Sequence, residues 1–425
     1  MKLSRYSKDR KLNEQEYILY NTLSRKYIYY SQVEKEEVNN FINNINRESY
    51  TAEEIRLCKD LMDKGIIIDE QIDELKTLEY LENKAWYQEK IYRLTIFATN
   101  TCNFRCSYCT QEHETSNLGD DVISKIYGVI EALSQKYEVL QITWFGGEPL
   151  LMYSKIKEII EEAIKICEAK GCELVNNFVT NGYLLNEVRI EELRRLHTET
   201  MQITVDSCPE IHNKQRPLIN GNGTYQEILN NIKLALASQI NVVLRINIDA
   251  DSYKYPLTIL DDIPPKLRKN TTISVSNIFQ NNERYSTYKI LYRAIEMGYN
   301  YSERENDYSG CLTCGNRRMV IDTNGDILFC TNANSKTGVI GELKENGVIT
   351  YKNRDKYMQM IMTSVRENEE CQRCIELPFC IKRCRLERVQ QNKRCYGKQN
   401  DGLSLEERAK LDFYYDWYNN KEKKE

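Results

Sequence analysis

Hydrophobic residues between positions 94 and 275 recur in two spacings that alternate along the chain. Short apolar segments typical of buried strands occupy residues 94–99, 140–145, 173–180, 201–205, 241–247 and 271–275. Amphipathic segments with helical spacing lie between them, at residues 122–136, 155–170, 188–196 and 225–238. Strands that alternate with helices predict an α/β fold with a parallel sheet, in which functional loops follow the carboxyl ends of the strands.

Residues 1–88 have a different pattern, which predicts a small winged-helix-like α+β domain. Residues 17–30 alternate loosely and are rich in Tyr and Ile, as in a hairpin or paired strands. Two helices and a closing strand are predicted after them, at residues 33–45, 51–64 and 66–68. The second helix begins with the capping-box sequence from Thr51 to Glu54.

The last third of the chain combines short elements with many cysteines. A helix is predicted at residues 289–298, followed by two strands, 319–321 and 326–329, which are joined by a turn at Gly325. An amphipathic helix at residues 403–417 is expected to pack on the α/β domain or on the amino-terminal domain. The pattern therefore divides the chain into four parts, residues 1–88, 89–300, 301–400 and 401–425.

Composition and charge give no support for nucleic acid or a membrane as partner. The chain has 425 residues, 41% of them hydrophobic and 29% charged, with a formal net charge of −4, so nothing favours nucleic acid or an anionic membrane as partner. The first residues, MKLSRYSKDRK, contain no apolar core of a signal peptide, and no segment is long enough to span a membrane. We therefore expect a cytoplasmic protein.

The chain has fifteen cysteines, which is many for a reducing compartment, and most of them occur in tight groups. The first group, just after the first predicted strand, has the spacing CxxxCxxC and consists of Cys102, Cys106 and Cys109. Three thiolates hold a metal or cluster and leave one coordination position open for chemistry. The alternative is a closed zinc site that takes His113 as its fourth ligand.

Further candidate binding residues follow the next predicted strands. Gly146-Gly147-Glu148 follows the second strand, where glycines allow a close backbone approach and Glu148 offers an acceptor for an ammonium group. Thr204 and Asp206 lie at the end of the fourth predicted strand, and Arg245 lies on the fifth. Asp206 and Arg245 are equally consistent with a salt bridge or a capped strand end.

These motifs resemble those of the radical S-adenosylmethionine (SAM) enzymes. The resemblance implies a partial (βα)6 TIM-like barrel and a [4Fe–4S] cluster on Cys102, Cys106 and Cys109, whose open iron binds SAM. It further implies that SAM is contacted by Tyr108, Gly146, Gly147, Glu148, Thr204, Asp206 and Arg245. One departure from the family pattern is Cys208, which stands where a glycine is usual.

Eight more cysteines occur between residues 311 and 395, in a pattern that resembles the SPASM (twitch-type) extension. By that resemblance they hold two auxiliary [4Fe–4S] clusters, which brings the expected total to three. The first would use Cys311, Cys314, Cys330 and Cys384. The second would use Cys371, Cys374, Cys380 and Cys395. Two zinc sites are the structural alternative, because thiolates also suit zinc.

The leading hypothesis is a radical SAM peptide maturase that cross-links or oxidises a ribosomally synthesised precursor peptide (RiPP). The amino-terminal domain resembles the peptide-recognition domain often fused to such enzymes, whose sheet edge accepts a leader peptide as an added strand. Reading of DNA is disfavoured by the acidic residues of this region, whereas plain packing is an equal alternative. An electron donor such as flavodoxin or ferredoxin is also implied.

Two other functions compete with this hypothesis. An anaerobic sulfatase-type maturase would oxidise Ser or Cys to formylglycine, but the position of its acidic base, after the auxiliary cysteine, is here Thr331. A zinc-binding interaction or regulatory protein would leave the glycine motif and the repeated strand and helix units without a role. No side chain is identified as the general base or radical partner.

Overall fold

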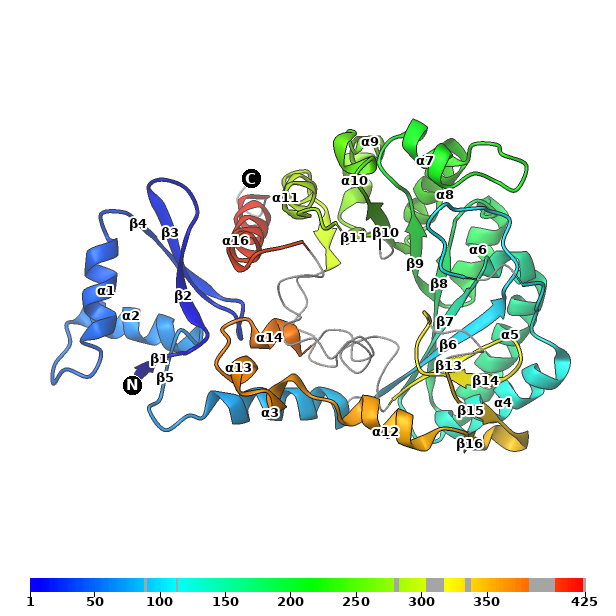
Figure 1. Cartoon of the computed structure of the whole chain (residues 1–425), viewed down its shortest axis with the longest axis horizontal. Helices are drawn as coiled ribbons and strands as arrows, with labels where there is room; N and C mark the ends of the chain where they lie inside the picture. The colour runs from blue at the N-terminus through cyan, green and yellow to red at the C-terminus, as the bar shows by residue number, and fades with distance from the viewer. Residues whose placement is uncertain are drawn as a thin grey trace. The chain divides into compact units, whose positions relative to one another are not determined.

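The structure, a computed structural model, describes residues 1–87, 90–111, 114–278, 283–302, 317–332, 338–381 and 402–422. By its contacts the chain divides into two compact units (Figure 1). Unit 1 comprises Met1–Gln88, Arg304–Gly310 and Thr363–Glu425, and unit 2 comprises Glu89–Glu303 and Cys311–Met362.

Unit 2 is built on an eleven-stranded sheet with the order β12-β11-β10-β9-β8-β7-β6-β13-β14-β15-β16. Its parallel part consists of β6 (Ile91–Thr99), β7 (Val139–Gly146), β8 (Glu173–Thr180), β9 (Thr198–Thr204), β10 (Asn241–Ile248), β11 (Thr271–Asn277) and β12 (Asn300–Tyr301). The outer side of these strands is lined by α4 (Asp120–Ser134), α5 (Tyr153–Lys170), α6 (Glu187–Arg195) and α8 (Tyr225–Ala237) (Figure 1). The predicted α/β barrel fold is confirmed, and the six predicted strands are β6 to β11, with the short β12 as a further parallel strand.

The sequence of β6 explains why it forms a central strand. Leu94, Ile96 and Ala98 are fully buried, and Phe97 on the opposite face is 5% exposed. Such burial on both faces is typical of parallel strands covered by helices on one side and filled on the other. The helix α4 buries Ile126 and Ile130, one turn apart, against this sheet layer.

A four-stranded extension continues the sheet beyond β6. It consists of β13 (Arg318–Ile321), β14 (Asp326–Leu328), β15 (Val339–Leu343) and β16 (Ile349–Tyr351). The strand β13 pairs in parallel with β6, and the following three strands are antiparallel, so the predicted hairpin at residues 319–329 is present. Because β13 occupies the outer edge of β6, that edge is not available to close the barrel onto β11 or β12.

Unit 1 contains a three-stranded antiparallel sheet with helices packed on it. The sheet has the order β2 (Ser7–Lys11), β3 (Glu16–Asn21) and β4 (Tyr27–Ser31). The other elements of this part are β1 (Lys2–Leu3), α1 (Lys35–Asn43), α2 (Ala52–Asp63), β5 (Ile67–Ile68) and α3 (Glu74–Tyr87). The predicted capping box is present, since Thr51 accepts from Glu54 N and the Glu54 carboxylate accepts from Thr51 N.

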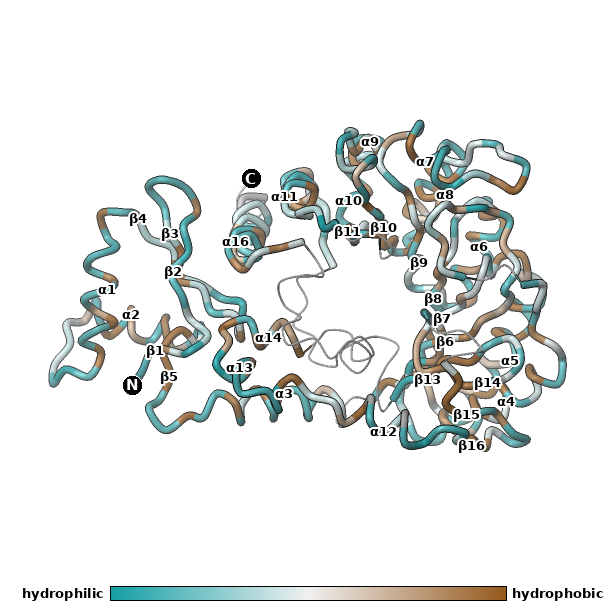
Figure 2. Tube along the Cα trace, in the orientation of Figure 1, coloured by the Kyte–Doolittle hydropathy of each residue, from teal (hydrophilic) through white to brown (hydrophobic). Residues whose placement is uncertain are grey.

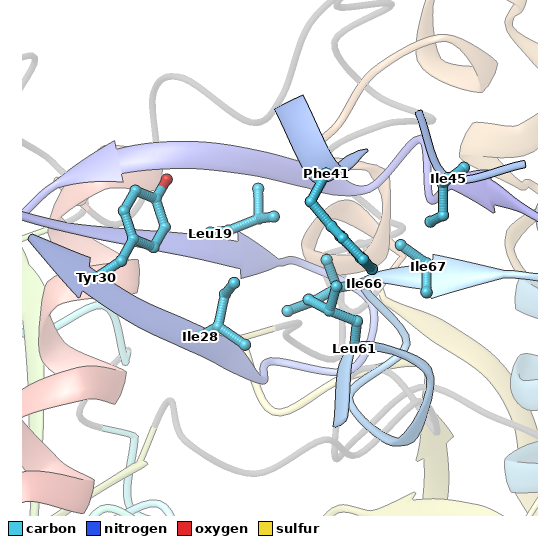
Figure 3. Packing of buried hydrophobic residues seen from close by; sticks show 8 residues of the cluster. All are labelled: Leu19, Ile28, Tyr30, Phe41, Ile45, Leu61, Ile66 and Ile67. Atoms are coloured by element: carbon cyan, nitrogen blue, oxygen red, sulfur yellow. The ribbon is translucent and has the colours of Figure 1, made fainter. Parts of the chain in front are cut away.

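The two faces of this sheet are covered by different parts of unit 1. One face packs against α1, α2 and β5 through Leu19, Ile28, Tyr30, Phe41, Ile45, Leu61, Ile66 and Ile67 (Figure 3). The other face contributes Ile18 and Tyr20 to a cluster with Phe379, Leu405 and Phe413. These last residues belong to α14 (Leu377–Cys380) and α16 (Leu405–Glu422). The terminal helix therefore packs on the amino-terminal domain, one of the two partners expected for it.

The helix α3 was not predicted from the sequence. It buries Leu78 and Trp86, and hydrophobic and hydrophilic positions alternate along it (Figure 2). Arg366 forms ion pairs with Glu79 and Glu82 on this helix, at 2.9 and 3.0 Å. No helix in the described ranges is both long and apolar enough to cross a membrane.

The structure contains ten further short helices and helical turns among the described residues. They are η1 (Pro149–Met152), α7 (Pro209–Gln215), η2 (Ser252–Lys254), α9 (Thr258–Asp262), α10 (Pro265–Arg268), α11 (Tyr288–Glu296), η4 (Glu345–Gly347), α12 (Arg354–Met362), η5 (Val365–Glu367) and α13 (Glu369–Gln372). The turn η4 lies against α4 at Gly128, where an added Cβ would be 2.6 Å from Gly347 N. This close approach fixes the sheet extension to a barrel helix.

Candidate active site at the cysteine loop

The cysteine loop follows β6 at the carboxyl end of the parallel sheet and carries Cys102, Cys106 and Cys109. Its backbone is paired with the end of α7 and the segment after it, because Ser107 N donates to Gln215 O and Arg105 N donates to Pro217 O, both at 2.9 Å. A side-chain bond from Asn181 Nδ2 to Asn103 Oδ1, 2.8 Å long, ties the loop to the end of β8. The loop conformation is thus fixed by two separate parts of the barrel.

Gly146 and Gly147 allow the turn after β7 to approach the backbone just before Cys102. A Cβ on Gly146 would lie 2.1 Å from Thr99 O, and one on Gly147 would lie 2.3 Å from Thr101 O. Gly147 N donates to Thr99 O at 2.8 Å. The sequence predicted that these glycines allow the backbone to approach a ligand. In the structure they also allow the turn after β7 to approach Thr99 and Thr101, and this contact sets where the cysteine loop begins.

We expect Gly147→Ala to displace the Thr101 backbone and to destabilise the protein by about 1–3 kcal/mol, the usual cost of overpacking. Iron bound at the cysteine loop should fall with it. Iron content after reconstitution and thermal unfolding measure the two effects. Gly119→Ala is the matched control, because its added Cβ would meet the tip of the Asp121 side chain and no backbone atom. Equal iron content in the two variants would contradict the prediction.

Glu148 is fully buried and already accepts three hydrogen bonds. Its carboxylate accepts from Thr180 Oγ1 and Asn181 N, both at 2.7 Å, and from Leu150 N at 3.0 Å. Burial raises the pKa of Glu148, and these hydrogen bonds oppose the rise. The observed contacts connect the glycine turn to the end of β8, while binding of the SAM ammonium by this carboxylate stays a prediction.

A pocket of about 380 Å³ opens beside the cysteine loop, at the carboxyl ends of β7 to β10. Of the predicted site residues, it is lined by Cys102, Cys106, Tyr108, Cys109, Gly146, Gly147, Thr204 and Arg245. Asp206 and Glu148 lie fully buried outside this lining. The structure therefore brings all three cysteines and most of the predicted SAM contacts around one cavity.

Several lining residues were not assigned to the site from the sequence: Asn181, Gln202, Arg216, Asn247, Thr331 and Asn332. Gln202 is two residues before Thr204 on β9, and Asn247 is two residues after Arg245 on β10. Alternate residues of a strand share one face, so this spacing could have predicted that Gln202 and Asn247 face the pocket together with Thr204 and Arg245. Thr331 and Asn332 directly follow Cys330. The sequence singled out Thr331 only as the position of the acidic base in formylglycine maturases, and it contained no signal for Asn332.

The Tyr108 hydroxyl is the centre of a hydrogen-bond network behind the pocket. It accepts from Arg216 Nη1 at 2.8 Å and from Asn247 Nδ2 at 3.2 Å, and it donates to the Asp206 carboxylate. Asp206 also accepts from Asn247 N at 3.0 Å. Burial raises the pKa of Asp206, while Arg216 opposes the rise. This network joins the cysteine loop to β9 and β10.

The donor set of the pocket fits a cationic iron centre. Burial raises the pKa of Cys102 to about 12 and also raises that of Cys106, where the nearby Arg216 cation opposes the rise. Such thiols lose their protons when a metal centre binds, so binding releases protons. Cys102 Sγ accepts from Phe104 N at 3.4 Å, the kind of contact that supports a cluster ligand.

Arg216 Nε is a buried donor that has no hydrogen-bond partner among the described residues. It can therefore donate a hydrogen bond to an anionic group bound in the pocket. No three Cys, His, Asp or Glu side chains in the described part of the chain are already gathered around the position of one metal ion. His113 lies outside the described residues, and so does the closed zinc site that would need it.

The auxiliary cysteines are distributed over both units. Cys330 is buried two residues after β14 in unit 2, and its Sγ accepts from Asn332 N at 3.3 Å. In unit 1, Cys371 is on α13, Cys374 follows it, and Cys380 ends α14. The other four predicted ligands lie outside the described residues: Cys311, Cys314, Cys384 and Cys395.

Family models match both the segment that carries the cysteine loop and the segment that carries several of the auxiliary cysteines. The family model of the radical SAM superfamily matches residues 96–261, and the SPASM model, an iron-sulfur cluster-binding domain, matches residues 311–375. The chain therefore contains a radical SAM domain and a SPASM domain. Members of this superfamily are enzymes that cleave SAM reductively, and the two domains imply SAM and [4Fe–4S] clusters as cofactors.

Curated relatives match mainly the radical SAM domain. A probable GTP 3′,8-cyclase of Methanocaldococcus jannaschii is 33% identical over 154 residues, which are 36% of this chain and 48% of the cyclase. The chain thus spans about half the length of the first relatives it matches. A longer match is the radical SAM cyclopropyl synthase TigE of Paramaledivibacter caminithermalis, 22% identical over 84% of this chain and 79% of that protein.

Solved structures share the fold. The enzyme anSMEcpe with bound AdoMet and Cp18Cys peptide aligns with a TM-score of 0.56 and 17% identity, covering 77% of this chain and 99% of that one. Streptococcus suis SuiB bound to precursor peptide SuiA aligns with a TM-score of 0.51 and 15% identity, covering 92% and 97%. At these identities the likeness supports the radical SAM fold.

Proposed function

We propose that the protein is a radical SAM/SPASM peptide maturase, which forms a thioether or carbon–carbon cross-link in, or oxidises, a ribosomally synthesised precursor peptide. The observation that carries the proposal is the pocket in which three cysteines, the glycine turn and two arginines meet at the ends of parallel strands. The chemistry that the cluster and SAM supply when bound is one-electron cleavage of SAM to methionine and a 5′-deoxyadenosyl radical, which takes a hydrogen atom from the substrate.

The residues of the pocket receive distinct roles in this proposal. Cys102, Cys106 and Cys109 hold the cluster, and the SAM contacts are those predicted from the sequence. Arg216 and Arg245 supply positive charge for the SAM carboxylate, and Arg245 is itself oriented by Asn247 Oδ1 at 3.2 Å and Ser274 Oγ at 3.3 Å. Two auxiliary clusters on the SPASM cysteines complete a set of three, with flavodoxin or ferredoxin as the electron donor.

Anaerobic reconstitution, iron and sulfide counting and a SAM-cleavage assay with dithionite test this function. About twelve irons per chain, together with 5′-deoxyadenosine, are expected for three [4Fe–4S] clusters. Zinc without iron, and no cleavage, would overturn the proposal in favour of a zinc-binding interaction protein.

A groove in unit 1 supports the proposal that the partner is a peptide. It has a volume of about 790 Å³ and lies between β4 and the helices α1 and α2. Its apolar part is formed by Ile28, Tyr30, Val38, Phe41 and Leu57. The strand β4 is an end strand of its sheet, so an extended leader segment can pair with it while apolar side chains enter the groove.

The charges of the groove indicate which leader it would accept. Within the groove, Arg47 pairs with Glu54 and Lys64 pairs with Asp60, both at 2.6 Å. The remaining charged lining residues are three exposed carboxylates near the start of α1, namely Glu34, Glu36 and Glu37. We therefore propose a leader in which apolar residues are flanked by Lys or Arg.

Replacing both Glu36 and Glu37 by Lys should weaken binding of the precursor peptide by roughly threefold to tenfold at low salt, and by less at high salt. Uncoupled SAM cleavage should not change. Fluorescence anisotropy with a labelled leader measures the affinity. Glu53→Lys, on α2 outside the groove lining, is the matched control. Unchanged affinity in the double variant would contradict the assigned leader charge.

The formylglycine alternative finds less support. Thr331, at the position of the expected acidic base, lines the pocket together with Asn332. The lining contains no carboxylate within the described part of the chain. A reaction that needs such a base beside the cysteine loop is therefore disfavoured.

A further inference from the structure

In unit 1 the start of the chain contacts the segment that carries Cys371, Cys374 and Cys380. The Arg5 guanidinium donates to Gln372 O, and Thr22 Oγ1 donates to Ile375 O at 2.6 Å. Both acceptors are backbone carbonyls next to or between the cysteines. The amino-terminal domain therefore holds the backbone of this cysteine segment directly.

The side chain of Tyr6 packs against the same cysteine segment. It is fully buried in a cluster with Leu78, Leu377, Cys380 and Ile381, and Cys371 packs against this cluster. The Arg5 guanidinium carbon lies 5.6 Å from the centroid of the Tyr6 ring. The ring is thus fixed between α3 and the cysteine segment.

The hydroxyl of Tyr6 is a buried polar group with no hydrogen-bond partner among the described residues. A polar network lies close by, in which Asn21 Nδ2 donates to Ser4 Oγ at 2.9 Å and Ser4 Oγ donates to Glu74, yet Tyr6 Oη has no bond to it. Native proteins rarely leave a buried hydroxyl unpaired, so this atom indicates a group that is bound here in the loaded protein.

A tyrosine hydroxyl carries one O–H donor, and sulfur is a weak acceptor of hydrogen bonds. The unpaired Tyr6 hydroxyl belongs to the same buried cluster as Cys380, and Cys371 packs against that cluster. The hydroxyl is therefore a donor available to a sulfur bound at this segment.

We propose that Tyr6 is a positioning residue of the second auxiliary centre, and that its hydroxyl donates a hydrogen bond to a sulfur of the cluster held by Cys371, Cys374 and Cys380. This inference rests on the proposed function, in which these thiols bind iron. Hydrogen bonds to cluster sulfurs raise the reduction potential, because they stabilise the more negative reduced state. The peptide-binding domain would thereby tune an electron-accepting centre.

Tyr6→Phe in the full, reconstituted chain tests the proposal, because the ring and its packing are kept. The variant is made in the background that lacks Cys102, Cys106 and Cys109, so that the signal of the SAM cluster does not overlap. Redox titration followed by electron paramagnetic resonance is expected to show one auxiliary potential shifted to a more negative value and the other unchanged. Tyr299→Phe is the matched control, since this buried hydroxyl donates to Leu260 O at 2.7 Å in unit 2.

Two outcomes would overturn the proposal in distinguishable ways. Unchanged potentials in Tyr6→Phe, with full iron content and an unchanged melting temperature, would overturn the role of Tyr6 alone. A chain that binds zinc and no iron at Cys371, Cys374 and Cys380 would overturn the proposed cluster as well. Metal analysis of each preparation separates these results.

Discussion

Replacing Cys102, Cys106 and Cys109 together by Ala is expected to abolish SAM cleavage and to remove about four irons per chain, while the auxiliary iron stays bound. All three thiols line one pocket and follow the central strand β6, and the lining formed by the described residues contains no other cysteine. Production of 5′-deoxyadenosine under dithionite should fall to the level without enzyme. Iron and sulfide counting on the same sample measures the second effect.

Cys167→Ala is the control for this experiment. Cys167 is buried on α5 and lies outside the pocket lining, so its loss should leave both cleavage and iron content unchanged. Retained cleavage in the triple variant would show that the radical chemistry is not performed at this loop. Loss of all iron would instead show that the auxiliary sites depend on the first cluster for their assembly.

Asp412→Asn should lower the free energy of unfolding of unit 1 by about 3–5 kcal/mol, the usual cost of removing one partner of a buried ion pair. The Asp412 carboxylate accepts from Arg25 Nη2 and Tyr20 Oη, both at 2.6 Å, and from Arg25 Nε at 2.9 Å. The side chains of Arg25 and Asp412 are 6% and 2% exposed. The variant removes the negative charge that the buried Arg25 guanidinium contacts.

Chemical denaturation followed by tyrosine fluorescence measures this loss. Glu406→Gln is the matched control on the same helix, because Glu406 forms an exposed pair with Lys410 and such pairs contribute little. If both variants unfold at the same denaturant concentration, α16 does not hold the amino-terminal sheet as the contacts indicate.

The packing of α16 affects how peptide binding should be studied. Removing the amino-terminal domain would expose Phe379, Leu405 and Phe413, which pack against its sheet. A truncated chain would therefore lose stability for reasons unrelated to the leader. Charge changes at Glu36 and Glu37 avoid this problem, because both side chains are exposed.

Local patterns in the sequence were sufficient for the parallel strands and the cysteine loop. Period-2 and helical spacing report burial of each segment, and CxxxCxxC places three thiols on one short loop whatever the rest of the chain does. The partners of Glu148 were not predictable, because Thr180 and Asn181 reach it only once β7 and β8 are side by side. Whether α16 packs on the barrel or on the amino-terminal domain likewise depends on contacts between residues far apart in sequence.

The pairing of β13 with β6 has a consequence for the order of folding during synthesis. Arg93 and Arg318 are partners in this pairing, and at roughly 5–20 residues per second their separation of about 225 residues corresponds to about 11–45 s on the ribosome. During that time the strand that leads into Cys102 has one edge without its final neighbour, and open edges promote aggregation. Chains that end before β13 should accumulate as insoluble protein, and slowing translation just upstream of Arg318 should lower the yield of full-length enzyme.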